Sequence, residues 1–160
     1  MRISLKLLAS VLLLASITLG GDAPKDPDPE VGAIEKLVAE YARCCEEEDL
    51  AGLARVFSNG PDTVWISAPS GRVVMGWKTI EEGYRYFFQN VADFETEFAV
   101  HSIKVFANGQ AACLTAHQDA TMRFNDNPIA FKDVRMTWCL EKQKAGWRVV
   151  NTHWSIAQLP

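Results

Sequence analysis

The stretch of sequence that decides the fold is residues 110–124, QAACLTAHQDATMRF. Most even-numbered positions in this stretch are apolar, whereas the odd-numbered ones from residue 113 to 121 carry Cys, Thr, His and Asp. Alternation with a period of two is typical of a strand that buries one face and leaves the other open. The stretch therefore predicts a long, half-buried β-strand.

The same alternation predicts neighbouring strands at about 94–106, 129–142 and 147–157. Turn signals separate the four segments, and Asn108-Gly109 is the strongest of them because both central residues of a tight hairpin must accept positive φ. Short turns make the strands antiparallel neighbours. The predicted register places His117 opposite Arg135 and Cys113 opposite Cys139 on the outer face, with inward positions at Ala112, Leu114, Ala116, Ala120, Met122, Phe124, Val134, Met136, Trp138 and Leu140.

Before residue 94 the apolar period is that of helices. It predicts helices at 31–48, 50–57 and 77–93, and the second helix has Asp49 as a candidate N-cap. A short hairpin with strands at 63–67 and 72–75 lies between the last two helices. Helices first and a meander second give an α+β fold, in which three N-terminal helices pack on a strongly curved, mostly antiparallel sheet.

Residues 1–20 read as a secretory signal peptide, because basic residues precede a short apolar run and small residues follow it. The run at 7–19 is shorter than the roughly 20 residues that span a membrane, although a retained anchor is the alternative. We expect an exported protein, periplasmic or secreted, with no stable membrane insertion after cleavage. Residues 21–30 form a Pro- and Asp-rich leader, and the folded domain covers 31–158.

Charge argues against nucleic acid as a partner. Sixteen Lys and Arg stand against 20 Asp and Glu, which gives a net charge of −4. Removing residues 1–20, which carry two basic residues and no acidic one, makes this −6. A nucleic-acid binder normally has a basic surplus. The four cysteines lack the spacing of a zinc site, and export leaves a Cys113–Cys139 disulfide possible but not required.

Several segments resemble the SnoaL-like branch of the nuclear-transport-factor-2-like superfamily, which includes the ketosteroid isomerases. They are VAEY at 38–41, EDL at 48–50, RVFS at 55–58, VVMGWKTI at 73–80 and, most specifically, GWRVVNTHWS at 146–155. The resemblance covers residues 31–157. It implies a cone-shaped fold (also called cystatin-like) with an internal pocket, and homodimers that form through the open sheet face.

The resemblance also implies where a site would lie. Tyr41 and Tyr84 match pocket tyrosines, and Trp154 matches an aromatic wall. Ketosteroid isomerases use a carboxylate base and a protonated aspartic acid, but the matching positions here are Ala68 and Met136. Isomerisation by that mechanism is therefore disfavoured.

Six residues are predicted to converge on the interior as ligand-binding candidates: Tyr41, Trp65, Tyr84, Phe88, Met136 and Trp154. Two interpretations stay open, an ordinary packed core or an aromatic pocket for a small apolar molecule oriented by the tyrosine hydroxyls. The pocket hypothesis leaves an enzyme of lyase or isomerase type and a simple binder as choices, with no cofactor and no metal expected. The alternative is a non-catalytic homodimeric association module that uses the open sheet face.

Other polar residues are weaker candidates. His117 and Asp119 share a strand face with Asp133 and Arg135, which fits an acid/base set but more commonly a solvated or dimer-facing charge network. His101 is interpreted as a lone structural histidine. His153 and Ser155 share a face, but no nucleophile turn accompanies them, so a catalytic triad is not indicated.

The pair Cys44-Cys45 lies on the first predicted helix, so at most one of the two thiols is expected to face the core fully. The acidic run at 46–49 should raise a thiol pKa, which favours structural rather than reactive cysteines. That run is interpreted as a solvated helix end and not as a calcium site, because consecutive helical residues point in different directions.

Overall fold

The computed structural model describes residues 28–67 and 71–156. The predicted signal peptide, most of the leader and Ala68 lie outside the described residues. The described elements follow in chain order: α1 (Pro29–Glu46), α2 (Leu50–Val56), β1 (Val64–Ile66), β2 (Val73–Met75), α3 (Trp77–Asn90), β3 (Val91–Phe106), β4 (Ala111–Phe124), β5 (Asn127–Gln143) and β6 (Gly146–Ser155). Among them is no helix that is both long and apolar enough to cross a membrane.

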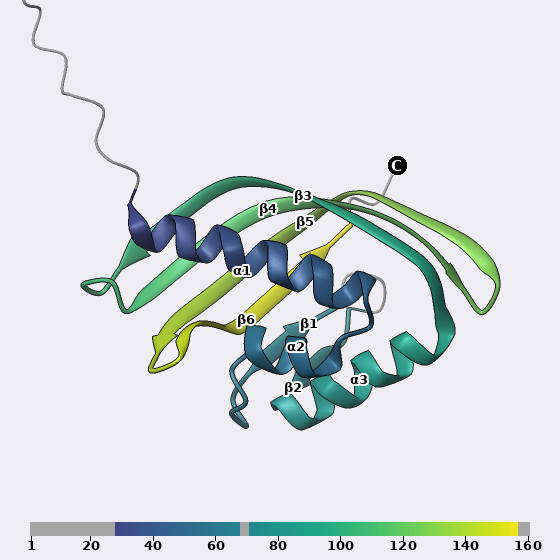
Figure 1. Ribbon diagram of the computed structural model, residues 1–160, viewed down its shortest axis with the longest axis horizontal. Coiled ribbons are helices and arrows are strands. Elements are labelled where there is room, and N and C mark those ends of the chain that lie inside the picture. The colour runs from purple at the N-terminus through teal and green to yellow at the C-terminus, as the bar shows by residue number, and fades with distance from the viewer. Residues whose placement is uncertain (1–27, 68–70, 157–160) are drawn as a thin grey trace, which may run out of the picture.

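The six strands form one sheet in the order β2-β1-β6-β5-β4-β3. All neighbours are antiparallel except β1 and β6, which pair in parallel. The sheet arches over the three helices, which all lie on its concave side (Figure 1). The predicted α+β fold, with helices packed on a curved and mostly antiparallel sheet, is confirmed.

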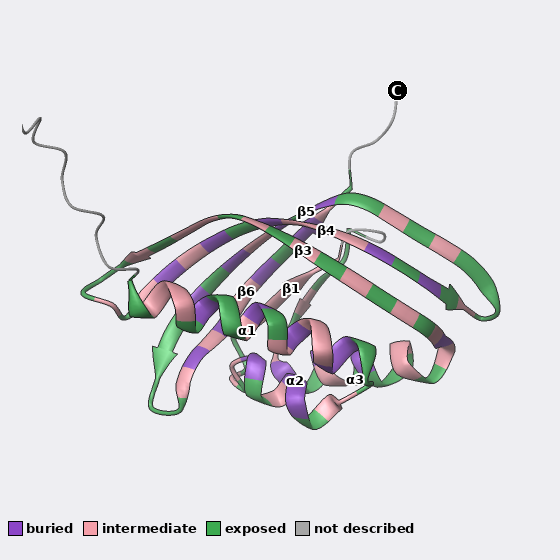
Figure 2. Cartoon of the chain, turned by 45° about the horizontal axis from the view of Figure 1, so that its top comes forward, coloured by how far each residue is buried: buried purple, intermediate pink, exposed green. Residues whose placement is uncertain are grey.

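The predicted faces of the long strands are also confirmed. Leu114, Met136 and Trp138 are at most 1% exposed, and buried positions recur along β4, β5 and β6 in Figure 2. The register pairs Cys113 with Cys139 and His117 with Arg135, as the alternation predicts. The two facing cysteines are free thiols in this structure.

Helix α1 begins at Pro29, two residues earlier than predicted, because Asp28 and Pro29 supply a helix start. The Asp28 side chain accepts a hydrogen bond from the Glu30 backbone N–H at 2.9 Å, and proline fits the first helical turn, where its missing N–H costs nothing. Glu30 then accepts from Trp147 Nε1 at 2.8 Å and from Lys142 Nζ. The last two residues assigned to the leader therefore belong to the domain and fix α1 to the β5–β6 hairpin.

Helix α3 ends at Asn90, three residues before the predicted end at 93, and β3 starts directly after it at Val91. The reason is the bend at the start of β3, where Asp93 has a φ of 53° and the β3–β4 register shifts between Ala92 and Glu95. Apolar Val91 continues the helical spacing in the sequence, so periodicity alone placed the boundary too late.

Cys44 and Cys45 are both buried, at 0% and 2% exposure, so the expectation that at most one faces the core was wrong. Helix α2 folds back over α1 and covers the side of the helix that carries Cys44. The close approach depends on Gly52, because a Cβ built there would overlap Cys44 Sγ and Asp49 Oδ2. Asp49 caps α2 as predicted, accepting from the Gly52 N–H at 2.7 Å.

We predict that Gly52→Ala destabilises the protein by about 1–3 kcal/mol, the usual cost of forcing extra volume into a packed contact. Gly32→Ala is the matched control, since a Cβ at that helical position meets nothing within 4 Å. It should stabilise the protein by roughly 0.5–1 kcal/mol through helix propensity. Urea unfolding of both variants measures the two changes, and equal signs would contradict the predicted α1–α2 contact.

Candidate functional site

A cavity of about 200 Å³ lies between the helices and the concave side of the sheet and is partly open to solvent. Tyr41 on α1 and Tyr84 on α3 contribute from the helices, and Trp154 contributes from β6. Further apolar side chains come from the end of α3 and the far half of the long strands: Phe87, Phe94, Met122, Phe131 and Val134. The cavity thus lies where the bent sheet separates from the helical layer.

Four of the six predicted site residues line this cavity: Tyr41, Trp65, Tyr84 and Trp154. The other two do not. Phe88 packs behind the wall with its ring centroid 6.0 Å from that of Tyr84, and Met136 is buried in the core at 1% exposure. Binding of a ligand by any of these residues stays a prediction.

Several lining residues were missed by the site prediction, although the sequence held a signal for some of them. Met122 was placed on the inward face by alternation, and Phe87 and Cys45 lie on the apolar stripes of their helices. What the sequence lacked was the bend that turns the far half of β4 and β5 over the cavity. Without that bend, Phe94 and Phe131 cannot be placed beside Tyr84.

The polar part of the cavity is a small network of neutral groups. The hydroxyls of Tyr41 and Tyr84 are 3.0 Å apart and hydrogen-bonded to each other, and the Cys45 thiol also lines the cavity. Burial raises the pKa of both phenols well above 10 and the pKa of Cys45 to about 12. All three groups are therefore protonated and uncharged at neutral pH.

This network leaves one hydrogen unused. Tyr84 and Tyr41 carry two hydroxyl hydrogens between them, and the bond that joins them uses one. One O–H is consequently available to an acceptor in the cavity. None of the lining side chains within residues 28–67 and 71–156 is an Asp, Glu, Lys, Arg or His, so the site offers hydrogen-bond donation without a charge.

The aromatic walls hold this network in place. The Trp65 ring stacks on Tyr84 with centroids 5.4 Å apart and planes 17° apart, and the Trp154 ring lies 6.0 Å from Tyr41. These contacts, one on each tyrosine, restrict the orientations of the two rings and so the positions of their hydroxyl oxygens. The network is thereby pre-organised before any ligand arrives.

The core beside the cavity contains several polar atoms without partners. Thr152 lies opposite Trp65 on one neighbouring strand and opposite Trp138 on the other. The Oγ1 atom of Thr152 is buried without a hydrogen-bond partner. The same holds for the indole N–H groups of Trp65, Trp138 and Trp154. A buried unsatisfied polar group costs about 1–3 kcal/mol. This region is therefore not optimised for stability alone, which is usual beside a binding site.

Asp119 takes part in a charged contact on the outer face with Lys132, in line with the charge network that was the favoured interpretation of His117 and Asp119. The register of β4 and β5 shifts between Gln118 and Ala120, and Asp119 closes this bulge. Its carboxylate accepts from the Asp133 backbone N–H at 3.0 Å and from Lys132 Nζ at 2.6 Å. These two contacts, with a small contribution from His117, lower the pKa of Asp119.

His101 is not a lone histidine, so that interpretation was wrong. The β3–β4 register shifts between Val100 and Ser102, and His101, at this bulge, reaches across to His117. Its Nε2 lies 2.8 Å from His117 Nδ1. The bulge has no clear signal in the sequence, which is why the pair was missed.

The cysteines of α1 are structural, as expected, but for a different main reason. Burial is the largest cause that raises the pKa of Cys44 to about 12, and Glu40 and Asp49 add to it. Arg43 Nη2 lies 3.2 Å from the Cys44 sulfur and lowers the pKa less than burial raises it. The same guanidinium binds Glu40 and Asp49 at 2.8 and 2.7 Å, so it neutralises a group of side chains whose spacing would suit a metal ion.

Fold and cavity together define a class, the cone-shaped α+β proteins with an internal aromatic pocket. Residues 34–158 match the SnoaL-like domain family, to which the chain belongs. No functionally curated protein matches the sequence.

Solved structures agree with this assignment at the level of the fold. A nuclear transport factor 2-like superfamily protein from Salmonella enterica superposes with a TM-score of 0.72 at 23% identity, over 82% of this chain and 93% of that one. A ketosteroid isomerase-like protein from Erwinia carotovora gives 0.67 at 16% identity, over 82% and 99%. A protein with a cystatin-like fold from Caulobacter vibrioides gives 0.65 at 21% identity, over 82% and 92%.

We predict that Asp119→Ala lowers the melting temperature at pH 7, because the bulge loses both of its contacts with the carboxylate. A carboxyl whose pKa is lowered in the folded state stabilises it above the unfolded pKa, near 3.9, and this contribution is lost as the pH falls through the folded value. The difference between wild type and variant should therefore shrink below about pH 4.

Asp126→Asn is the control, since the Asp126 side chain is 97% exposed, forms its one ion pair within the described residues with Arg123 at 3.6 Å, and has a φ of 63° that Asn also tolerates. Its melting temperature should follow the wild type at every pH. A constant gap between wild type and Asp119→Ala from pH 7 to pH 3 would show that the carboxylate charge does not hold the bulge.

Proposed function

We propose that the cavity binds a small, neutral, mainly apolar ring compound that carries an acceptor oxygen. The observation that carries this proposal is the hydroxyl pair of Tyr41 and Tyr84, 3.0 Å apart in a cavity whose described lining has no charged side chain. A carbonyl or ether oxygen would take the unused hydrogen of the network. Aromatic walls would cover the rest of the ligand.

Binding is the proposed activity rather than proton abstraction from carbon. Neutral hydroxyls can polarise a carbonyl, but a general base must hold a lone pair at a pKa suited to the working pH. The raised pKa values of Tyr41, Tyr84 and Cys45 exclude them from that role near neutrality. Membership of a fold family does not by itself add a reaction.

A thermal-shift experiment with matched ligands tests the proposal. A neutral cyclic ketone and the hydrocarbon with the same ring skeleton should both raise the melting temperature, because each binds the folded state. We expect the wild type to prefer the ketone by roughly two- to tenfold, which corresponds to one hydrogen bond of about 0.5–1.5 kcal/mol. The double variant Tyr41→Phe/Tyr84→Phe should bind both equally.

The single variant Tyr41→Phe and the control Tyr86→Phe separate the network from tyrosine content in general. Tyr86 is 59% exposed on α3 and lies outside the cavity lining, so its variant should keep the ketone preference. A panel of ring compounds that shifts no melting temperature, or a preference that survives in the double variant, would refute the proposed pocket.

We infer a second role for the outer face of the sheet, which is association with a second copy of the chain. The described helices all lie on the opposite side (Figure 1). The middle of this face carries small, uncharged side chains, namely Cys113, Thr115, Thr137 and Cys139. At the edge of the sheet, the side chains of Val73 and Met75 on β2 are 63% and 60% exposed. Large apolar side chains exposed together support an interaction surface.

Sedimentation velocity tests this association. The wild type should be a dimer, and Val73→Lys/Met75→Lys should be a monomer at the same concentration, because burying two ammonium groups is costly. Lys78→Glu on the exposed surface of α3 is the control and should stay dimeric. A wild type that remains monomeric at high concentration contradicts the proposal. Export, which rests on the composition of residues 1–20, is a separate prediction.

A further inference from the structure

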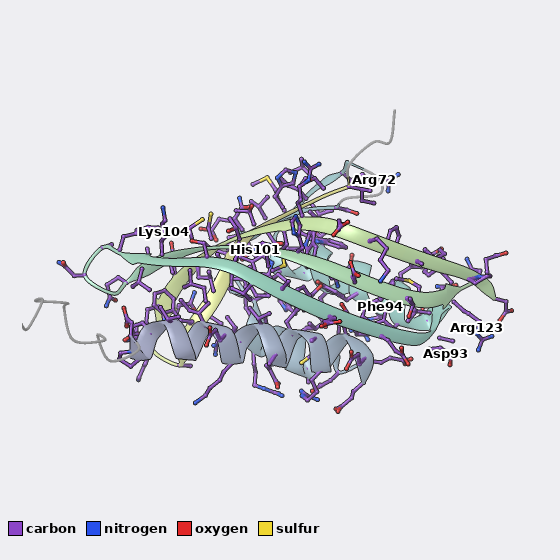
Figure 3. All side chains as sticks on the ribbon, turned by 90° about the horizontal axis from the view of Figure 1, so that it is seen from above. Arg72, Asp93, Phe94, His101, Lys104 and Arg123 are labelled. Carbon is purple, nitrogen blue, oxygen red and sulfur yellow. The ribbon has the colours of Figure 1, made fainter. Side chains whose placement is uncertain are left out.

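We propose that His101 and His117 form a two-histidine chelate for a divalent transition-metal ion on the outer face of the sheet. The proposal is independent of the cavity, which lies on the other face. Figure 3, which views the sheet from above, shows His101 on β3. His117 is on the neighbouring strand β4, whose register with β3 is fixed by the pairs on both sides of the bulge.

The geometry of the two rings carries the proposal. His101 Nε2 and His117 Nδ1 are 2.8 Å apart, and the rings meet edge to face with centroids 4.6 Å apart and planes 77° apart. Zinc binds imidazole nitrogen at about 2.0–2.1 Å, so one ion can reach both nitrogens. Two ligands this far apart subtend an angle near 85° at the ion, and an opening of roughly 0.5 Å gives the tetrahedral angle.

The rings are free to change from hydrogen bond to chelate. A neutral imidazole has one N–H and one lone pair, and at present one of the converging nitrogens donates to the other. Within the described residues, the nitrogen on the far side of each ring has no hydrogen-bond partner. The donor ring can therefore move its hydrogen to that nitrogen, and rotation of the two exposed rings about their side-chain bonds would then direct both lone pairs at one ion.

The backbone explains why the two rings stay together. Phe98, Ala99 and Val100 pair in regular register with Gln118, His117 and Ala116, and the ladder resumes at Ser102 with Thr115. His101 is the extra residue between these two regular segments, so its side chain is set diagonally across from His117. Aromatic side chains reach diagonal neighbours on an antiparallel pair. The chelate therefore needs no rearrangement of the sheet.

The chemistry of the ligands selects the kind of ion. Imidazole suits Zn²⁺, Cu²⁺ and Ni²⁺, whereas Ca²⁺ and Mg²⁺ prefer oxygen. The field around the site is mixed, since Arg135 is the register partner of His117 and Asp119 lies close enough to interact with it. The ion would therefore be held by bonds to the two histidine nitrogens, with water as the remaining ligands. Attraction to a negatively charged surface would contribute little.

Titration calorimetry of the full chain with ZnCl₂ tests the chelate. The wild type should bind one ion per chain, and His101→Gln and His117→Gln should each weaken binding by at least about tenfold, the low end of the cost of losing even an outer-shell partner. His153→Gln is the matched control, because His153 is also exposed on a strand but has no histidine beside it. Its affinity should equal that of the wild type.

A Cys113→Ser/Cys139→Ser background separates the histidines from the facing thiols, which also attract zinc. Retained binding in this background, lost again on adding His117→Gln, supports the chelate. Binding that disappears with the serines, survives either histidine change, or falls equally in His153→Gln overturns it. Circular dichroism of each variant checks folding, which should be unchanged because both rings are on the surface.

Discussion

The ring of Tyr41 is the contact through which the two layers of the molecule meet. Its edge or face contacts five other aromatic rings, which come from the end of α2, from α3 and from three strands: Phe57, Tyr84, Phe98, Trp138 and Trp154. Edge-to-face pairs contribute about 0.5–1.5 kcal/mol beyond the area they bury. One side chain on α1 thus contacts α3, the end of α2 and three of the six strands, and it also carries one of the two hydroxyls of the cavity network.

This double use explains why the site is part of the core rather than a separate groove. The ring of Tyr41 contacts five aromatic rings and borders the cavity, while its hydroxyl hydrogen-bonds Tyr84. A side chain fixed in this way loses little further freedom when a ligand binds, which lowers the entropic cost of recognition. The buried polar atoms around Thr152 show that stability is given up in the same region.

The helical and sheet layers, and the buried face of each strand, could be predicted because both follow from the period at which apolar residues recur in the sequence. The alternation of apolar and polar residues in β4 and β5 predicted their register and which of their side chains face the helices. The helical spacing of apolar residues predicted that Tyr41 and Tyr84 face the sheet. The bulges at His101 and Asp119 could not be predicted, since one extra residue in a strand leaves composition and period almost unchanged. The bulge at Asp119 lies between the lining residues Gln118 and Ala120, and so the site was predicted less completely than the fold.

The position of β6 between β1 and β5 has a consequence for biosynthesis. The last of the described strands, β6, occupies an interior place in the sheet, so the hairpin of β1 and β2 has no strand of the main sheet to join until β6 has been synthesised. Until then, the apolar face of the helices is incompletely covered and stays accessible to chaperones that bind nascent chains. Folding that depends on such distant pairing is slow, so we expect completion of the sheet by β1 and β2 to be a late step that follows formation of the β3–β4–β5 meander.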